Sequence, residues 1–555
     1  MTSRDRLPRR VERDQHCEAK TDAVRRGAVG TAGGSPFNCR LSFLTRPYPI
    51  TALWCVDERR MISRDRRVAI RGAFRLLLIG PLGSGFHRHT PPGTGKAALM
   101  HTWKVGIIGG GPGGLMTAYS LQKCATVPYT TTIFEAGTRL GGKILTNRFS
   151  HAGANYEAGA AELYDYSPVV DEDALRELVE ELGLSVTPMR GSAVIMNHRV
   201  LSNLEDIRDH IGAGACGALS AFDRSAKDRI SPHEFYNSDD PTGADADPTN
   251  RRFDTLLAEL PEPGTRHYIQ NMIHSDLATE PEKTSIVYGL HNYLMNDPSY
   301  MQLYSIAGGN ELLPRELAAR VRATKHMEHA VTAVGKGEDG KLVVTSTHHG
   351  HERHDEFDFV VVALPNNYLP SITYQGGRLA AALKEHYAHY DHPAHYLRIT
   401  ILFDRTFWRD ALPDSYWMLD RFGGCCLYDE SSREPGATHS VLGWLVGGEA
   451  AREMSELSDE QLIEAALDSL PEFLSHGRRF YIEGRIHRWV GAVNALPGGV
   501  IKRSLDRRHR PEPVEHPNLF FVGDYLFDST LNGVLDSAGY VAEWVAARMT
   551  ETSGA

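Results

Sequence analysis

Short apolar runs alternate with stretches of helical spacing along the chain after residue 100. Residues 104–108 (KVGII) are almost continuously apolar, which is typical of a strand buried on both faces. Residues 115–121 place apolar side chains at helical spacing, and residues 131–134 have the pattern of a second short strand. Further helical patterns occupy residues 173–182, 459–470 and 534–548, and further strand patterns occupy 341–345 and 357–364. The order of these elements predicts an α/β fold.

A glycine-rich turn joins the first strand to the first helix. Residues 109–114 (GGGPGG) fit the spacing G-x-G-x-x-G, in which Gly109 permits a tight turn, Gly111 lets a pyrophosphate approach, and Gly114 allows close helix–strand packing. The helix N-terminus adds free N–H groups and partial positive charge. Glu135 ends the second strand about twenty residues later, where an acid can bind a ribose. The glycine spacing, the flanking strand and helix, and the acid at position 135 together predict a dinucleotide-binding unit. A glycine-rich turn without a ligand would not require this combination.

Two other glycine-rich stretches lack this context. Residues 91–96 (PPGTGK) are similar to the phosphate loop of ATPases, but Thr90 stands where that loop needs glycine and Ala97 where it needs Ser or Thr. Residues 212–217 (GAGACG) also spell G-x-G-x-x-G, yet they follow the charged, helix-like residues 204–210. We therefore interpret 212–217 as a loop and expect a single dinucleotide fold in the chain.

The first 99 residues differ in charge from the rest of the chain. They hold 19 Lys and Arg against 8 Asp and Glu, although the whole chain has a net charge of −10. Their scattered Gly and Pro and their lack of a sustained apolar period predict a basic, disordered extension, and Met100 is a candidate natural start. The acidic remainder argues against a nucleic-acid partner. No apolar stretch is long enough to cross a membrane, so we expect a cytoplasmic protein.

Neither the cysteines nor the histidines predict a metal site. The seven cysteines form no C-x-x-C pair and no zinc spacing, which indicates reduced thiols. Residues 348–355 (HHGHERHD) have metal-binding side chains, but they lie between the strand patterns 341–345 and 357–364. We expect a solvated hairpin tip there, and no bound metal.

Blocks along the chain resemble the flavin-containing amine oxidase superfamily. They occur in the family's order, from residue 104 to about 547. After the glycine loop they are 135–143 (EAGTRLGGK), 156–160 (YEAGA), 306–314 (IAGGNELLP), 358–365 (DFVVVALP), 518–524 (NLFFVGD) and 529–538 (STLNGVLDSA). The resemblance implies a Rossmann-like FAD-binding domain interleaved with a substrate domain of a sheet plus helices. The implied FAD segments are 100–170, 300–370 and 480–548, the substrate segments are 171–299 and 371–479, and residues 1–99 form the extension.

The resemblance also implies residues that hold FAD. The glycine loop would receive the pyrophosphate, Glu135 the adenosine ribose, and Arg139 with the backbone near Gly142 would neutralise phosphate charge. Backbone groups at Val331 would pair with adenine, and Asp524 would bond the ribityl chain. The implied cofactor-binding set is Gly109, Gly111, Pro112, Gly113, Gly114, Glu135, Arg139, Gly142, Lys143, Val331, Gly523, Asp524, Thr530 and Leu531.

Two further features concern the flavin ring. Thr530 and Leu531 would open the last helix, whose N–H groups face the flavin N1–C2=O locus. Residues 494–499 contain no Cys, so the resemblance implies non-covalent FAD.

The substrate half departs from the family pattern. Arg398 stands where many members place a lysine that holds water near flavin N5; a guanidinium can orient water or hold a substrate carboxylate, and it can instead pair with an acid in the sheet. Glu162 stands where L-amino-acid oxidases place a carboxylate-binding arginine, so it would favour a cationic amine. Trp489 fits the family tryptophan. Tyr525, with Tyr416, Trp417 and Trp444, would line a pocket or pack in the core.

We therefore expect an FAD-dependent oxidoreductase that oxidises a C–N bond of an amine or amino acid to an imine, with O₂ as acceptor giving H₂O₂. Its expected partners are the small substrate and O₂, without nucleic acid or membrane, and a homodimer is left open. Two alternatives keep the cofactor: a desaturase or dehydrogenase acting on C–C bonds, and a non-catalytic flavin-binding protein whose basic extension binds a partner.

Overall fold

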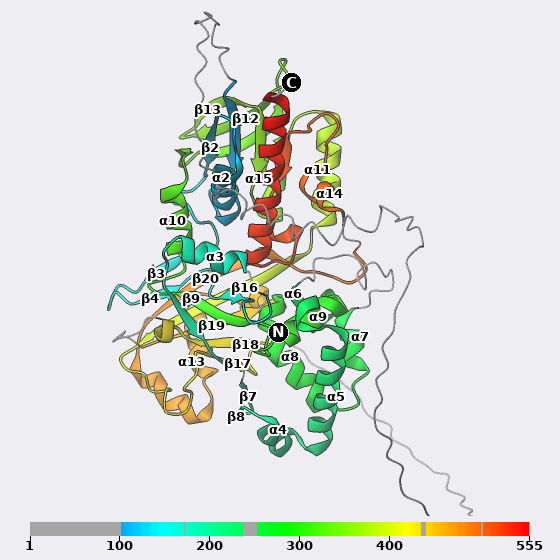
Figure 1. Cartoon of the computed structure of the whole chain (residues 1–555). Helices are drawn as coiled ribbons and strands as arrows, with labels where there is room; N and C mark the ends of the chain where they lie inside the picture. Colours follow the sequence, from blue (N-terminus) through cyan, green and yellow to red (C-terminus); the bar gives the residue numbers. More distant parts are fainter. Residues whose placement is uncertain are drawn as a thin grey trace, which may run out of the picture. The chain divides into compact units, whose positions relative to one another are not determined.

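The computed structural model describes residues 101–170, 173–191, 193–236, 252–433, 440–500 and 503–553. The predicted extension, the 91–96 motif and Met100 lie outside these residues. The described residues form five β-sheets with helices around them (Figure 1). No helix among them is both long and apolar enough to cross a membrane.

A parallel five-stranded sheet contains the predicted dinucleotide unit. Its order is β10-β2-β1-β14-β21, built from β10 (Thr324–His326), β2 (Tyr129–Phe134), β1 (Trp103–Ile108), β14 (Phe359–Val362) and β21 (Leu519–Phe521). Ile107 and Val361 face the helices α2 (Pro112–Cys124), α10 (Leu312–Arg320) and α15 (Leu531–Ser553). Ile108 and Val362 face a second sheet. Burial on both faces explains the continuous apolar runs, and the predicted strand–turn–helix is confirmed.

The second sheet has the order β13-β12-β11-β15. Its strands are β13 (His351–Phe357), β12 (Leu342–His348), β11 (Ala330–Lys336) and β15 (Thr373–Tyr374). His349 and Gly350, both with positive φ, turn the chain from β12 into β13, and His351 to His354 are exposed. The predicted hairpin tip in the histidine-rich stretch is therefore confirmed.

A seven-stranded sheet has the order β20-β16-β19-β18-β17-β7-β8. Its strands are β20 (Tyr481–Asn494), β16 (Pro393–Phe403), β19 (Ser440–Gly447), β18 (Cys425–Asp429), β17 (Tyr416–Leu419), β7 (Val194–Met196) and β8 (Arg199–Leu201). Side chains alternate along β16: Leu397 and Ile399 pack in the core that contains α13 (Asp459–Asp468), whereas Tyr396 packs in the core on the opposite face. Arg398 therefore projects from the same face as Tyr396.

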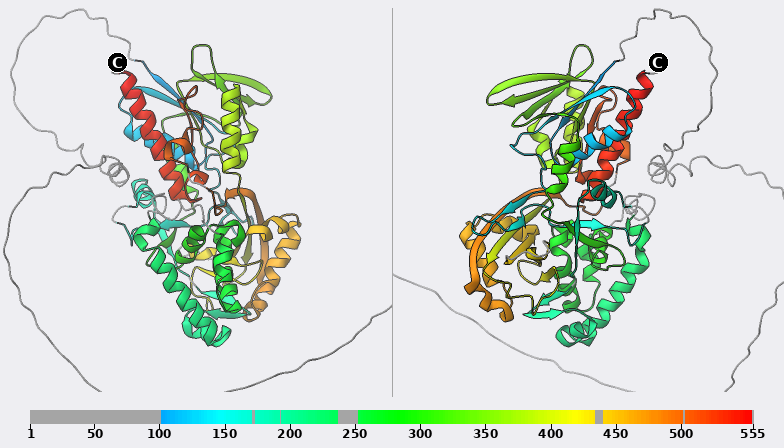
Figure 2. Two further views of the ribbon diagram at one scale, coloured as in Figure 1. Left: turned by 90° about the vertical axis from the view of Figure 1, so that its right-hand side faces the viewer. Right: turned by 60° about the vertical axis from the view of Figure 1, so that its left-hand side comes forward.

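Helices of the middle of the chain cover that opposite face. They are α5 (Ala213–Arg229), α8 (Pro263–Leu277) and α9 (Ile286–Leu294), and they share a core with Tyr416, Met418 and Tyr428 of the sheet. Figure 2 shows these green helices on one side of the sheet and the orange α13 on the other. β20 falls within the segment 480–548 that the resemblance assigned to FAD binding, and the domain boundaries stay predictions.

The prediction of a loop at 212–217 is wrong. Gly212 (φ 97°) ends α4 (Leu204–Ile211), and α5 begins at the next residue. Cys216, Leu219 and Phe222 are buried in the core with α8. This tertiary packing stabilises a helix whose glycines alone disfavour it by about 1 kcal/mol each.

The remaining elements are short. Two small antiparallel sheets pair β3 (Thr146–Arg148) with β4 (Asn155–Glu157) and place β9 (Gln302–Ile306) between β5 (Leu163–Asp165) and β6 (Val186–Met189). The predicted helix at 173–182 is α3 (Ala174–Glu181), capped by Asp173. The other helices are α6 (Pro232–Tyr236), α7 (Phe253–Ala258), α11 (Gly377–His389), α12 (Gly448–Met454) and α14 (Leu505–His509).

Candidate functional site

The turn between β1 and α2 is a cradle that excludes side chains. A Cβ on Gly109 would lie 2.5 Å from the Ala363 carbonyl oxygen, and a Cβ on Gly114 would strike the Gly109 carbonyl oxygen. Pro112 occupies the first helical position, so the Gly113 and Gly114 amides lie in the first turn, where no intrahelical carbonyl can accept from them. Close backbone approach and unpaired donors together fit a bound phosphate.

A second glycine loop forms the facing wall of the cradle. The Gly141 amide donates to the Gly110 carbonyl (2.8 Å), and a Cβ on Gly142 would lie 3.1 Å from the Gly111 Cα. The Arg139 guanidinium donates to carbonyl oxygens of this loop, including those of Gly142 and of Ile144 (3.2 Å). Arg139 thus fixes the shape of the second wall.

The residues predicted to bind adenosine lie together beyond this cradle. The Glu135 carboxylate accepts from the amides of Gly110 (2.9 Å) and Gly137 (2.7 Å), which ties the second strand to the glycine turn. The His329 amide donates to the Glu135 carbonyl (2.9 Å), so the start of β11, with Val331, lies beside Glu135. Carboxylate oxygens have several lone pairs, which leaves Glu135 able to accept further bonds.

The C-terminal signature meets the other end of the cradle. The Lys143 ammonium lies 2.6 Å from the Asp524 carboxylate and donates to the Ala492 carbonyl (2.9 Å). The Thr530 hydroxyl accepts from the Gly533 amide (3.1 Å) and so caps α15, whose first residue is Leu531. The N-terminal ends of α2 and α15 meet, because a Cβ on Gly113 would contact Val534 (3.7 Å). Gly523 and the other residues of the predicted cofactor set therefore surround one edge of the parallel sheet.

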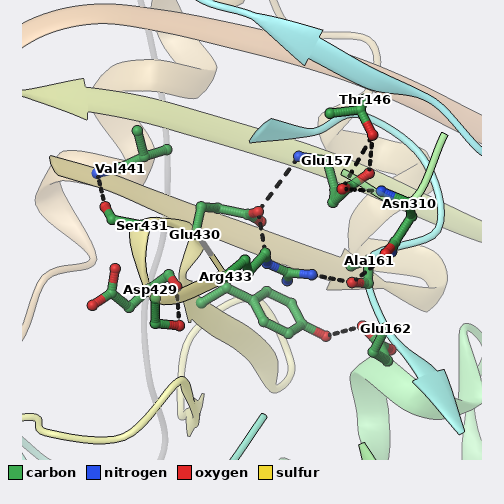
Figure 3. A network of polar contacts seen from close by, with 12 residues as sticks. Thr146, Glu157, Ala161, Glu162, Asn310, Asp429, Glu430, Ser431, Arg433 and Val441 are labelled. Atoms are coloured by element: carbon green, nitrogen blue, oxygen red, sulfur yellow. Dashed lines mark hydrogen bonds and ion pairs between the residues drawn. The ribbon is translucent and has the colours of Figure 1, made fainter. Parts of the chain in front are cut away.

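A buried ionic network lies on the site-facing side of the seven-stranded sheet. Arg398 is fully buried and forms an ion pair with Glu430, which follows β18. Glu430 also pairs with Arg433 (2.9 Å), and Arg433 donates to the Ala161 carbonyl. Figure 3 shows the Glu430 carboxylate between the Glu157 backbone amide and the Arg433 guanidinium. From the sequence alone, Arg398 could act near the flavin or pair with an acid in the sheet, and the structure shows that it pairs with Glu430. A catalytic role for Arg398 stays a prediction.

Glu157 completes this network. It is 2% exposed and accepts from the Asn310 amide (2.8 Å) and the Thr146 hydroxyl (3.0 Å). Burial raises the pKa of Glu157 to about 7, although Arg433 opposes the shift. This carboxyl is therefore partly protonated at neutral pH.

Glu162 joins the network to a cluster of buried and partly buried tyrosines. The Tyr428 hydroxyl donates to the Glu162 carboxylate (2.8 Å), and the guanidinium carbons of Arg398 and Arg433 lie 5.4 and 5.0 Å from the Tyr428 ring centre. Burial raises the pKa of Tyr428 well above its usual range. These cation–π contacts fix the position of the Tyr428 ring, and the hydroxyl of that ring in turn positions the Glu162 carboxylate.

Four other groups share one property with the Tyr428 phenol. Burial is the main cause that raises the pKa of the Asp276 carboxyl and of the phenols of Tyr164, Tyr288 and Tyr396. All four side chains nevertheless keep some accessible surface. Tyr164, Tyr288 and Tyr396 pack against the core that contains Tyr428, so they form one cluster of tyrosines with it.

Trp489 and Tyr525 occupy different positions. Trp489 lies opposite Tyr396 on the neighbouring strand, and its indole N–H donates to the Ala158 carbonyl (2.7 Å). Tyr525 is 2% exposed and lines a cavity that Tyr288 also lines. Trp417 and Trp444 pack in the core on the α13 side, so core packing is correct for them.

Asp276, Tyr428, Glu430 and Arg433 were not found from the sequence. Tyr428 and Glu430 lie about thirty residues after Arg398, and no local spacing links them. Asp276 offered one signal, because it is in the last turn of α8, where the helix dipole disfavours a carboxylate.

Comparison with known proteins agrees with this architecture. The family described as flavin containing amine oxidoreductase matches residues 112–546. Wild-type putrescine oxidase bound to putrescine is 18% identical, with a TM-score of 0.63 over 81% of this chain and 99% of the other. Cyclohexylamine oxidase from Brevibacterium oxydans IH-35A is 18% identical, with a TM-score of 0.62 over 82% of this chain and all of the other. At this identity the likeness to solved structures concerns the fold.

Proposed function

Because the chain belongs to the flavin-containing amine oxidoreductase family and is thus a flavin-dependent oxidoreductase, we propose that it oxidises the C–N bond of a cationic amine, with FAD as cofactor and O₂ as acceptor. The observation that carries the substrate class is the Glu162 carboxylate, which accepts a hydrogen bond from the Tyr428 hydroxyl beside a cluster of packed tyrosines.

The residues of the cradle support FAD as the flavin cofactor. The Gly113 and Gly114 amides would bind the pyrophosphate, Glu135 the ribose, and Asp524, with Lys143, the ribityl chain. The start of α15, capped by Thr530, would place its amides near the flavin N1–C2=O locus. Bound FAD would supply the acceptor for a hydride from the carbon that carries the amine.

The protein's own residues would bind and orient the amine. A carboxylate in a desolvated wall attracts an ammonium group more strongly than one in water, because the local dielectric is low. The same carboxylate would repel the carboxylate of an amino acid, which favours amines over amino acids. The two solved structures named above are oxidases of amines by name, which agrees with this choice.

The C–C oxidation alternative is less consistent with the site. Its apolar substrates would leave the Glu162 carboxylate without a cationic partner. The cytoplasmic location, the non-covalent mode of binding and the homodimer stay predictions.

The test is anaerobic bleaching of the flavin absorbance of the purified protein by amines, L-amino acids and D-amino acids. We expect bleaching by at least one amine. Glu162→Gln should raise the amine concentration needed for half-maximal bleaching by about tenfold or more, the size expected for one charged hydrogen bond. Glu464→Gln, at an exposed Glu on α13, is the matched control.

Three results would contradict the proposal. A protein without flavin absorbance would remove the cofactor. Bleaching by amino acids alone would contradict the role of Glu162, and equal half-maximal concentrations for Glu162→Gln and wild type would remove it from substrate binding.

A further inference from the structure

A cavity is lined by residues of α9, α11, α14 and the end of β20. Its volume is about 90 Å³, which is room for roughly six to nine water molecules or for one small ligand. The chain that follows Asp524 adds another wall through residues 525–528. None of the residues predicted to bind FAD lines this cavity, so its walls are other residues than those of the cradle.

Arg508 brings a buried positive charge to this cavity. It lines the cavity and is only 3% exposed. Its Nε donates to the Arg503 carbonyl (2.7 Å) and its Nη1 to the Leu526 carbonyl (3.0 Å). Among the described residues it has no ion-pair partner, and its Nη2 has no hydrogen-bond partner but keeps accessible surface. Buried charges are normally paired, so this guanidinium is suited to bind an anion.

A second arginine strengthens the positive charge of the same wall. Arg503 lines the cavity, and its ion-pair partner Glu385 has a side chain that is 69% exposed, where water screens the pair. Burial raises the pKa of the Tyr390 phenol to about 12, and the charges of Arg508 and Arg503 oppose that rise. Both guanidinium groups therefore lie near the Tyr390 ring.

One carboxylate faces the two guanidinium groups in the lining. Asp528 accepts from the Thr530 amide (3.1 Å) and hydroxyl (2.6 Å), which stabilise its charge. Burial lowers the pKa of His389 and of His392, so these two rings are neutral at pH 7. Two arginines against one aspartate leave the lining with a net positive charge.

Three polar atoms of the lining residues are buried and have no hydrogen-bond partner within the part of the chain that the structure describes. They are the hydroxyls of Tyr390 and Tyr525 and Nε2 of His392. The rings of Tyr390 and Tyr525 meet with their centres 5.4 Å apart. Such unpaired atoms are rare, because each one is costly. Their concentration around one cavity indicates that it takes a polar ligand.

We propose that this cavity is a binding site for a small oxyanion, a carboxylate or a phosphate group, held by Arg508 and Arg503. A guanidinium forms strong, charge-assisted hydrogen bonds with the oxygens of either group. The volume suits inorganic phosphate or a short carboxylate rather than a nucleotide. The inference does not depend on the proposed amine oxidation.

The test is equilibrium dialysis of the flavin-loaded protein against radiolabelled inorganic phosphate and, separately, radiolabelled acetate, in Tris chloride. We expect saturable binding of at least one of them, and the tighter one identifies the group that the site prefers. Arg508→Gln should weaken this binding by about tenfold or more, the size expected for one lost charged hydrogen bond. Arg507→Gln, at an exposed residue of the same helix, is the matched control and should bind as wild type does.

A second pair of variants decides the question if Arg508→Gln does not fold or does not retain flavin. His389→Glu places a negative charge in the wall of the cavity and should weaken anion binding by about tenfold, because like charges repel. His389→Gln is the neutral control at the same position and should bind as wild type does.

Two results would overturn the inference. One is the absence of saturable binding of both anions to the wild-type protein. The other is equal affinity within either pair, of Arg508→Gln and Arg507→Gln or of His389→Glu and His389→Gln. The amine panel does not affect this measurement, so this inference and the proposed function can fail independently.

Discussion

Replacing Glu430 by Gln removes one negative charge from between two buried guanidinium groups. Glu430 is fully buried at its side chain and pairs with Arg398, which is also fully buried, and with Arg433, which is 7% exposed at its side chain. Gln has nearly the same volume, so the change leaves no cavity. The effect is therefore electrostatic.

The expected loss of stability depends on which partners Arg398 and Arg433 keep in the Glu430→Gln variant. Arg433 retains the Ala161 carbonyl, but Nε and Nη1 of Arg398 have no hydrogen-bond partner, and Glu430 is the one ion-pair partner of Arg398 among the described residues. Removing one partner of a buried ion pair typically costs about 3–5 kcal/mol. Total stabilities are about 5–15 kcal/mol, so Glu430→Gln should lose a large fraction of the free energy of unfolding.

The assay is urea unfolding of the flavin-loaded proteins at equal excess flavin, followed by tyrosine and tryptophan fluorescence and by circular dichroism. Glu464→Gln is the matched control, because Glu464 pairs with Arg478 at the surface, where such pairs are worth about 0–1 kcal/mol. A midpoint for Glu430→Gln no lower than that of Glu464→Gln would refute the reasoning.

Two further changes test the cradle and the buried network. Gly114→Ala would drive a Cβ into the Gly109 carbonyl oxygen and should lower the flavin-to-protein absorbance ratio. Gly217→Ala is the control, because in α5 no atom lies within 4 Å of the new Cβ, and it should keep the wild-type ratio. Equal ratios in the two variants would contradict the role of Gly114. Because burial raises the pKa of Glu157 to about 7, the folded protein holds this proton where the unfolded chain, with a pKa near 4.5, has released it. Stability should therefore fall as pH rises from 4.5 to about 7, and Glu157→Gln should lose that fall; urea midpoints at pH 5 and pH 7 check this, and an unchanged difference in the variant would count against it.

Local patterns predicted the cradle well. The spacing of Gly109, Gly111 and Gly114 and the position of Glu135 depend on one strand, one turn and one helix, so the sequence contains the whole constraint. The last helix, α15, was found for the same reason, from its apolar spacing.

Residues whose partners are distant in the chain were not predictable in this way. The acid beside Arg398 comes from a different strand end, and Asp276 comes next to Tyr396 because α8 packs across the sheet. The loop expected at 212–217 is a helix because packing against α8 outweighs its glycines. In each case contacts between segments distant in the chain determine the local structure, and a single sequence does not show which segments come into contact.

The five-stranded sheet draws its strands from residues 103–134, 324–362 and 519–521. A ribosome releases the chain from the N-terminus, so the glycine turn emerges first and waits for β21 and α15, which follow about 400 residues later. Pairing of such distant segments is slow, because the loops between them must first close. The flavin cradle is therefore complete only after α15 has begun to emerge, and a nascent chain stalled before residue 519 lacks both the edge strand and the helix N-terminus that a captured flavin would need.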